Sequence, residues 1–209
     1  LSVARIEGQA VAPGGTVALA SGATVTLSGG RLVYDPAGAF DGLGATETAT
    51  DSFTYAAGDG IAVSAPARFT VTVGGDNAPV EIDPGASALD GAFAETAVPA
   101  RAEGTVAFTD ADAGDIHTAA LSGGDPGFSL GAVTGPAGGA PGTVPWSFVP
   151  DAALLDGLFA GETRSFAATA TVSDGAGSTA SAGLSVTVTG VNDAPVASAD
   201  AAATDEGAS

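Results

Sequence analysis

The sequence predicts an all-β protein built from tandem antiparallel β-sandwich domains, and three observations support this. Polar and apolar residues alternate along short segments such as 52–55 and 69–73, which is typical of half-buried strands. Glycine (32 residues) and proline (12 residues) separate many such segments, as expected for short strands joined by turns. The chain also repeats itself with a period of 115 residues, which indicates two similar domains in series.

The repeat is clearest where each domain ends. Residues 71–80 read VTVGGDNAPV and residues 186–196 read VTVTGVNDAPV. Three pairs of identical residues upstream are each 115 positions apart: Asp41 and Asp156, Glu47 and Glu162, Asp59 and Asp174. We therefore expect a first module at 1–75 and a second at 76–190, followed at 191–209 by a linker and the opening strand of a further repeat.

The alternation also locates the strands. We expect them at 3–7, 16–20, 24–28 and 31–34 in the first module, and at 105–109, 116–121 and 144–148 in the second. Each module should end in a long hairpin, because an Asp-Gly turn at Asp59 or Asp174 lies between two alternating runs. Helix is expected only as a short crossover at 151–157, which matches 40–43 in the first module and bridges two sheets. Residues 135–142 form a Gly/Pro/Ala loop, with disorder as the alternative.

Charge and composition limit the classes of partner. The formal net charge is −19, from 24 acidic and 5 basic residues, so the chain should repel nucleic acid and anionic membranes and attract cations. Acidity alone could equally serve solubility or a salty habitat. Without cysteine, stability must come from packing, backbone pairing or bound metal. No apolar run is long enough to span a bilayer, and the start at Leu1 lacks a leader, so we expect a soluble piece of a longer precursor.

Catalytic arrangements find little support. His117 is the only histidine, so a zinc centre is effectively excluded and a serine triad would depend on this one imidazole. We expect His117 to be a half-buried or exposed bystander on a strand. Paired carboxylates could cleave glycosides, but they would need a cleft that small sandwich domains rarely form. Trp146 and the neighbouring aromatic residues could offer a sugar platform, although their alternating positions favour a place in the core.

Acidic loops are the strongest candidates for a binding site. Asp110, Asp112 and Asp115 lie within six residues, where their carboxylates repel unless they are protonated, solvated or bridged by a cation. Calcium takes six to eight oxygen ligands of this kind, and a solvated acidic turn at Gly114 is the alternative. The joints, Asp76-Asn77 and Asn192-Asp193, offer the same chemistry, with a plain Asx turn before proline as the alternative. We assign Asp59 and Asp174 to turns, and Glu47 and Glu162 to structural roles.

Several of these segments resemble known repeat families. In the second module, TDADAGDIHT at 109–118, VPWSF at 144–148, SDG at 173–175 and the VNDAPV end resemble VCBS-type repeats. In the first module, TVTL at 24–27, LVYDP at 32–36 and TDSFTY at 50–55 are similar to bacterial cadherin-like repeats of giant secreted adhesins of the RTX type. The first joint departs from the pattern, because it is one residue shorter and exchanges the amide and the acid.

The resemblance implies immunoglobulin-like (cadherin-like) sandwiches that bind Ca²⁺ within or between domains. It also implies a non-catalytic extender region of a large extracellular bacterial adhesin, at the cell surface or in a biofilm, with neighbouring repeats as partners. Glu95 is the expected strand-borne glutamate of such a joint. The full set of expected calcium ligands is Asp76, Asn77, Glu95, Asp110, Asp112, Asp115, Asn192 and Asp193.

Two alternatives belong to other classes. In one, the first module lacks its opening strand, and a tail such as 197–209 fills the open sheet edge of a second copy, giving a self-assembling surface-layer or fibre subunit. A carbohydrate-binding module would instead require an exposed aromatic patch around Trp146.

Overall fold

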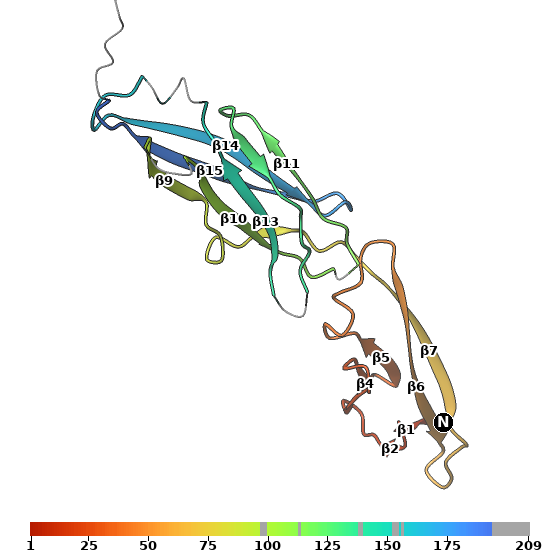
Figure 1. Cartoon of the computed structure of the whole chain (residues 1–209). Coiled ribbons are helices and arrows are strands. Elements are labelled where there is room, and N and C mark those ends of the chain that lie inside the picture. The colour runs from red at the N-terminus through yellow and green to blue at the C-terminus, as the bar shows by residue number, and fades with distance from the viewer. Residues whose placement is uncertain (97–99, 113, 138–139, 152–154, 156, 194–209) are drawn as a thin grey trace, which may run out of the picture.

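The chain forms two elongated β-sheet modules joined end to end, as Figure 1 shows for the computed structural model. The structure describes residues 1–96, 100–112, 114–137, 140–151, 155 and 157–193. The strands β1–β7 lie within residues 2–74 and β8–β15 within residues 81–189. No sheet combines strands from both groups, so each module builds its own core.

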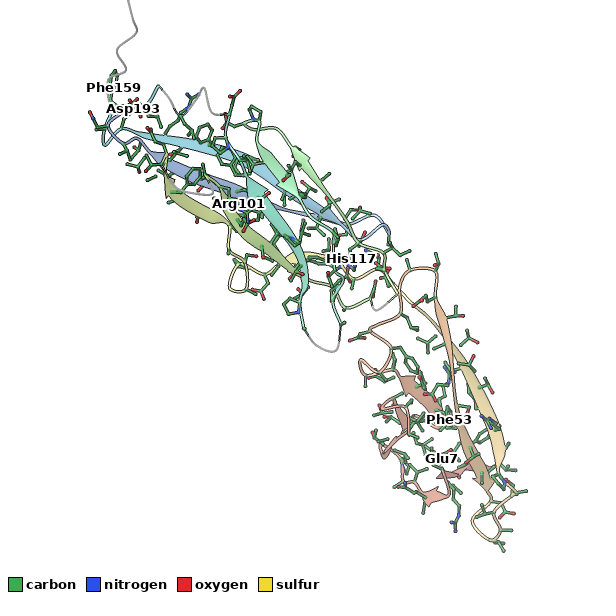
Figure 2. The ribbon with its side chains drawn as sticks, viewed as in Figure 1. Glu7, Phe53, Arg101, His117, Phe159 and Asp193 are labelled. Carbon is green, nitrogen blue, oxygen red and sulfur yellow. The ribbon has the colours of Figure 1, made fainter. Side chains whose placement is uncertain are left out.

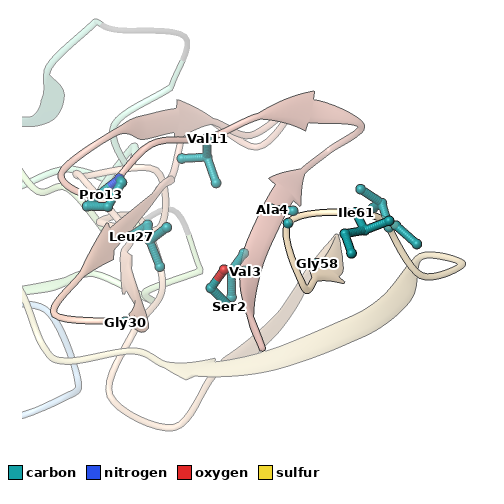
Figure 3. A pocket seen from close by; sticks show the side chains of 12 residues that line it. Ser2, Val3, Ala4, Val11, Pro13, Leu27, Gly30, Gly58 and Ile61 are labelled. Atoms are coloured by element: carbon teal, nitrogen blue, oxygen red, sulfur yellow. The ribbon is translucent and has the colours of Figure 1, made fainter.

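The first module consists of two sheets of unequal size. One has the order β2-β1-β6-β7, and the other has the order β3-β4-β5. Their bounds are β1 Ser2–Ile6, β2 Gln9–Ala10, β3 Thr16–Ala18, β4 Thr24–Ser28, β5 Arg31–Asp35, β6 Thr48–Gly58 and β7 Ala67–Gly74. Ile6, Val25 and Phe53 are buried between the sheets, and a cavity of about 430 Å³ remains beside Val3 and Leu27 at the hairpin end (Figure 3).

The second module is a fuller sandwich of two four-stranded sheets, ordered β12-β13-β10-β8 and β11-β14-β15-β9. All its strand pairs are antiparallel except β9 with β15, which run parallel. The bounds are β8 Glu81–Ile82, β9 Asp90–Ala94, β10 Ala102–Thr109, β11 Thr118–Ser122, β12 Phe128–Leu130, β13 Gly142–Phe148, β14 Thr163–Ser173 and β15 Thr179–Thr189. Phe108, Phe148 and Phe166 fill the core with aliphatic residues of both sheets.

The all-β class and the antiparallel sandwiches predicted from the sequence are confirmed. The longest alternating runs became the hairpins β6–β7 and β14–β15, and residues 40–43 form turns that cross between the sheets of β5 and β6. β2, β8 and β12 were missed, because they are only two or three residues long and show too little alternation, and β9 was missed as well. Part of the 135–142 loop is held by an isolated bridge between Ala137 and Ala140, whereas the helix expected at 151–157 lies largely outside the described residues.

Trp146 lies in the core, with only 2% of its surface exposed. Its indole Nε1 donates a hydrogen bond of 2.7 Å to the carbonyl of Ala88, which satisfies the polar atom of a buried ring. A carbohydrate platform built on Trp146 is therefore excluded, and the expectation that this residue packs in the core is confirmed.

Candidate metal centre at the joint between the modules

Four segments meet where β7 of the first module leads into β8 of the second. The joint itself is 75–79, and the turn at 43–47 approaches it from the first module. The second module contributes the loop at 110–115 between β10 and β11, and the tip of the β14–β15 hairpin at 174–178. Residues that are far apart in the sequence are thereby brought to one place.

Asp174 anchors the hairpin tip to the joint. Its Oδ1 accepts hydrogen bonds of 2.9 to 3.0 Å from the backbone amides of Ala176, Gly177 and Ser178. Its Oδ2 accepts one of 3.2 Å from Nδ2 of Asn77, across the boundary between the modules. The predicted turn role of Asp174 is therefore confirmed, and the same carboxylate also binds the joint.

The loop at 110–115 is closed by its own acidic side chains. Asp110 Oδ1 accepts the amide of Asp112 at 2.9 Å, and the amide of Asp115 donates to the carbonyl of Asp112 at 3.3 Å. Asp112 is buried, and its Oδ2 accepts the amide of Ala78 in the joint at 2.8 Å. This bond fixes the loop against the linker, as the one from Asn77 fixes the hairpin tip.

The carboxylates of Asp110, Asp115 and Asp174 are close enough to interact strongly. One oxygen from each lies within 4.8 Å of the others. At an effective dielectric constant of about 20, two unit charges at that distance repel by about 3.5 kcal/mol. Burial raises the pKa of Asp115, and the charges of Asp110, Asp112 and Asp174 raise it further. Burial also raises the pKa of Asp174, but hydrogen bonds from Asn77 and from the turn amides outweigh it, so the net shift is downward.

Three oxygens at this place are buried without a hydrogen-bond partner: Asn77 Oδ1, Asp112 Oδ1 and Asp115 Oδ2. Buried polar atoms are normally paired, so three unpaired acceptors in the segments that meet at the joint require an explanation. In the described part of the chain no arginine supplies it: Arg101 pairs with Glu103, and the side chain that contacts Asp110 is the imidazole of His117. The donor set is made of carboxylate and amide oxygens, which suit a hard cation.

Glu47 brings the first module into the cluster. Its Oε2 accepts the amide of Gly44 at 3.1 Å, and its carbonyl accepts the amide of Gly75 at 2.9 Å. The other carboxylate oxygen faces the acidic loop so closely that a Cβ on Gly114 would lie 2.7 Å from it. A cavity of about 340 Å³, lined by Glu47, Asp115 and Asp174 among others, lies between the modules here.

The structure divides the predicted ligands between the two ends of the second module. It brings together Asn77, Asp110, Asp112 and Asp115, and adds Asp174 and Glu47, which we had assigned to structural roles. Asp76 lies exposed in the joint, where its Oδ1 accepts the amide of Asn77.

Glu95, Asn192 and Asp193 lie at the opposite end of the second module from the joint. Asn192 Nδ2 donates to the carbonyl of Asp193, and the amide of Glu95 donates to the carbonyl of Thr189 at the end of β15. Figure 2 shows Asp193 and Phe159 at this far end, and His117 near the joint. The internal repeat was the sequence signal for Glu47 and Asp174, because each has an identical counterpart 115 residues away.

The expectation that His117 lies on a strand is wrong, whereas its role as a bystander stays a prediction. The His117 side chain is only 3% exposed, its Nε2 lies 2.9 Å from Asp110 Oδ2, and its ring packs against Phe108. It precedes β11, which begins at Thr118, so its ring turns toward the acidic loop. Its Nδ1 is buried and unpartnered, and among the described residues no serine hydroxyl bonds to this imidazole, as a serine triad would require.

Comparison with known proteins gives structural likeness only. No protein-family model and no curated protein matches the chain. Similar solved structures include mouse clustered PcdhgC3 EC1-3 (16% identity, TM-score 0.44, 83% of this chain and 53% of that chain) and PcdhgB3 EC1-4 (21%, 0.40, 84% and 40%). Cadherin-like domains 1 to 4 of zebrafish RET are also similar (16%, 0.36, 81% and 39%).

The chain therefore spans about half of these structures or less. At such low identities and TM-scores, the likeness carries nothing about ligands or partners. The described residues contain no helix with the length and apolar character needed to cross a membrane.

Proposed function

We propose that the joint between the modules is a calcium site that holds them at a fixed angle. The observation that carries this proposal is the set of buried, unpaired oxygens of Asn77, Asp112 and Asp115 beside the carboxylates of Asp110 and Asp174. These groups come from the joint, a loop and a hairpin tip, so an ion bound among them links all three segments.

Calcium fits this donor set better than the other common cations. Calcium takes six to eight oxygens and tolerates irregular geometry, whereas magnesium demands a near-ideal octahedron and zinc favours nitrogen and sulfur ligands. The residues that would hold the ion are Asn77, Asp110, Asp112, Asp115 and Asp174, with Glu47 from the first module. A bound dication would supply positive charge that offsets the mutual repulsion of the carboxylates.

The consequence would be a calcium-dependent stiffness. The hydrogen bonds from Asn77 and Ala78 tie the joint to the second module, but both donors belong to the linker itself. Glu47 Oε1 lies beside Gly114 of the acidic loop, so without a cation its negative charge adds to that of the loop. A calcium ion that also binds Glu47 would link the turn of the first module to the loop of the second and so fix the angle between the modules.

At the scale of the whole protein, we propose that the chain is a non-catalytic extender in an extracellular adhesion array. The repeated modules, the net charge of −19 and the resemblance to VCBS-type and bacterial cadherin-like repeats support a large secreted adhesin of the RTX type, acting at a bacterial surface or in a biofilm. The proposed limits are 1–75 and 76–190 for the modules and 191–209 for the linker to a further repeat. Neighbouring repeats are the partners.

The far end of the second module has features that support a series of modules linked by calcium sites. Glu95 Oε2 is buried without a partner there, and Glu162 repeats the turn that Glu47 makes at the first joint. Together with Asn192 and Asp193, these residues would form the half of a second calcium site that a following module completes.

Thermal unfolding of the full chain in calcium, in magnesium and in chelator, at matched ionic strength, tests the site. Extracellular calcium modules often have a Kd of about 10⁻⁴ to 10⁻³ M, so about 10 mM calcium should stabilise the protein by about 1.4–2.7 kcal/mol. That corresponds to a rise in Tm of roughly 3–10 °C, with a smaller response to magnesium. Proteolysis at 74–78 should also slow in calcium.

Asp112→Asn keeps an acceptor for the amide of Ala78 but removes one ligand charge, so it should reduce the calcium-dependent shift. Glu103→Gln removes the same formal charge from an exposed site on β10 and should leave the shift intact. Identical unfolding curves in calcium and chelator would disprove the site. If both variants lost the calcium-dependent shift in Tm equally, the effect would depend on net charge alone and not on a site at the joint.

A further inference from the structure

Asp110 is held in the acidic cluster by a side chain from outside that cluster. Its Oδ1 accepts the amide of Asp112 at 2.9 Å, and its Oδ2 lies 2.9 Å from Nε2 of His117. An ionised carboxylate can only accept a hydrogen bond, so Nε2 is the donor whether the imidazole is neutral or charged. Each carboxylate oxygen has two lone pairs, so this bond leaves Asp110 able to bind a cation as well.

The imidazole of His117, which lies near the joint (Figure 2), is itself fixed by the core of the second module. Its ring centroid lies 4.9 Å from that of Phe108, which is fully buried on β10. Gly135 also borders the ring, because a Cβ there would lie 3.5 Å from Nδ1. The side chains of His117 and Asp110 are only 3% and 0% exposed. The position of Asp110 Oδ2 therefore depends on the packed core through one hydrogen bond.

The bond to Asp110 is the one hydrogen bond that the described residues give this imidazole. The other ring nitrogen, Nδ1, is buried and has no partner. A buried nitrogen without a partner destabilises the fold, and an aliphatic residue in the same place would avoid that cost. Packing against Phe108 alone therefore does not account for a histidine at this position, whereas a donor directed at a metal ligand does.

Asp110 needs such a donor because the neighbouring carboxylates repel it. One oxygen each of Asp110, Asp115 and Asp174 lies within 4.8 Å of the others, and like charges at this distance repel. A cavity of about 390 Å³, lined by Asp83, Asp110 and His117 among others, lies beside the cluster. Without the bond to His117, rotation about the side-chain bonds of Asp110 would let its carboxylate move into this cavity, away from the other two.

We propose that His117 is a positioning residue for the calcium site, and that the hydrogen bond from its Nε2 holds Asp110 in the orientation that binds the ion. This inference rests on the proposed calcium site, and it replaces the bystander role expected for His117. A ligand that is already in place need not be ordered when the ion binds, so the bond raises the affinity. Outer hydrogen bonds of this kind commonly fix metal ligands, and loss of one typically lowers the affinity about 10- to 100-fold.

Calcium titration of the full chain, followed by Tm at matched ionic strength, tests the role of His117. Each rise in Tm is measured from the variant's own value in chelator, so that lost packing alone does not change it. His117→Leu removes the donor and should need about tenfold more calcium for the same rise. His117→Phe keeps a ring beside Phe108 without the donor and should behave alike. His117→Gln places an amide nitrogen near the position of Nε2 and should restore most of the affinity.

A double-mutant cycle shows whether His117 acts through Asp110. Asp110→Ala removes the carboxylate that the imidazole orients, so adding His117→Leu to this variant should not raise the calcium requirement further. An equal further loss in that background would overturn the positioning role, and so would a glutamine variant that binds as weakly as the leucine variant.

Two other outcomes separate this inference from the calcium site itself. If the apolar variants at His117 respond to calcium at the same or lower concentrations than the parent, the positioning role is wrong and the calcium site stands. If the parent shows no rise in Tm with calcium, the calcium site is wrong and the role of His117 is wrong with it.

Discussion

The two modules end in the same backbone structure, and within the described residues the first of these ends faces an acidic loop. In the first module the amide of Gly44 donates to Glu47 Oε2 and the carbonyl of Glu47 accepts from Gly75. In the second module the amide of Phe159 donates to Glu162 Oε2 at 2.9 Å, which repeats the bond of 3.1 Å from Gly44 to Glu47. Gly190 donates to the carbonyl of Glu162 at 2.8 Å, which repeats the second bond.

The comparison teaches that the turn forms from residues of its own module. It closes equally well beside the loop at 110–115 and at the far end, where the structure describes no such loop. The two turns differ at two positions, Gly44 against Phe159 and Thr46 against Gly161, and the first of these lies beside the acidic loop. Gly44 leaves room for Asp115, whose Oδ1 would lie 3.3 Å from a Cβ at that position, whereas the equivalent Phe159 is 81% exposed. The two ends are therefore built to receive different surfaces.

The largest expected effect concerns the glycine that closes each turn. A Cβ on Gly75 would overlap the carbonyls of Leu43 and Gly44, and one on Gly190 would overlap the carbonyl of Phe159. Either alanine substitution should therefore destabilise its own module by about 1–3 kcal/mol, measured by urea unfolding. Only Gly75→Ala should also weaken the calcium response, because it displaces the turn that carries Glu47.

Gly74→Ala is the matched control, because nothing lies within 4 Å of a Cβ at Gly74. If this neighbouring substitution were as damaging as Gly75→Ala, the destabilisation would come from replacing glycine in general and the role assigned to the turn would be wrong.

The next-largest expected effect distinguishes the structural role of Glu47 in its turn from its role as a metal ligand. Glutamine at position 47 keeps an acceptor for the amide of Gly44 but loses the charge that faces the acidic loop. Glu47→Gln should weaken calcium binding about tenfold, or about 1.4 kcal/mol, by titration calorimetry. Glu162→Gln makes the same change at the far end and should leave the affinity of the first joint unaltered. A tenfold loss in both variants would contradict a site confined to the first joint.

The smallest effect is a gain of stability without calcium. Burial and three neighbouring carboxylates raise the pKa of Asp115, so its ionised form destabilises the folded protein. In chelator, Asp115→Asn should raise the free energy of unfolding by about 1 kcal/mol, or roughly 2–4 °C in Tm. In calcium the same variant should lose stability relative to the parent, because a ligand charge is gone.

The pH dependence has a definite sign. A carboxyl group whose pKa is raised on folding favours the folded state below its ordinary pKa of 3.8, and this contribution is lost as the pH rises through the raised value. The advantage of Asp115→Asn in chelator should therefore shrink between about pH 7 and pH 4. Asp174, whose pKa is lowered, loses its contribution as the pH falls below 3.8, equally in both proteins. A constant advantage across this range would refute the electrostatic cause.

The sequence predicted the features that depend on neighbouring residues. The hairpins β6–β7 and β14–β15 follow from long alternating runs around Asp-Gly turns, and the cluster of Asp110, Asp112 and Asp115 follows from its spacing. Features that depend on distant contacts were missed. Asp174 meets Asn77 across 97 positions, and its local sequence is like that of Asp59, which stays exposed. β9 was missed for the same reason, because its parallel partner is remote and its residues are mostly small.

The parallel pairing of β9 and β15 has a consequence for a chain pulled at both ends. The polypeptide enters the second module ahead of β9 and leaves it after β15, so opposite pulls drag these two strands past each other along their length. The ladder bonds between them, including Ser185 with Leu89 and Glu95 with Thr189, are then loaded together instead of opening one by one. The described strand pairs of the first module are all antiparallel, so this loading geometry belongs to the second module.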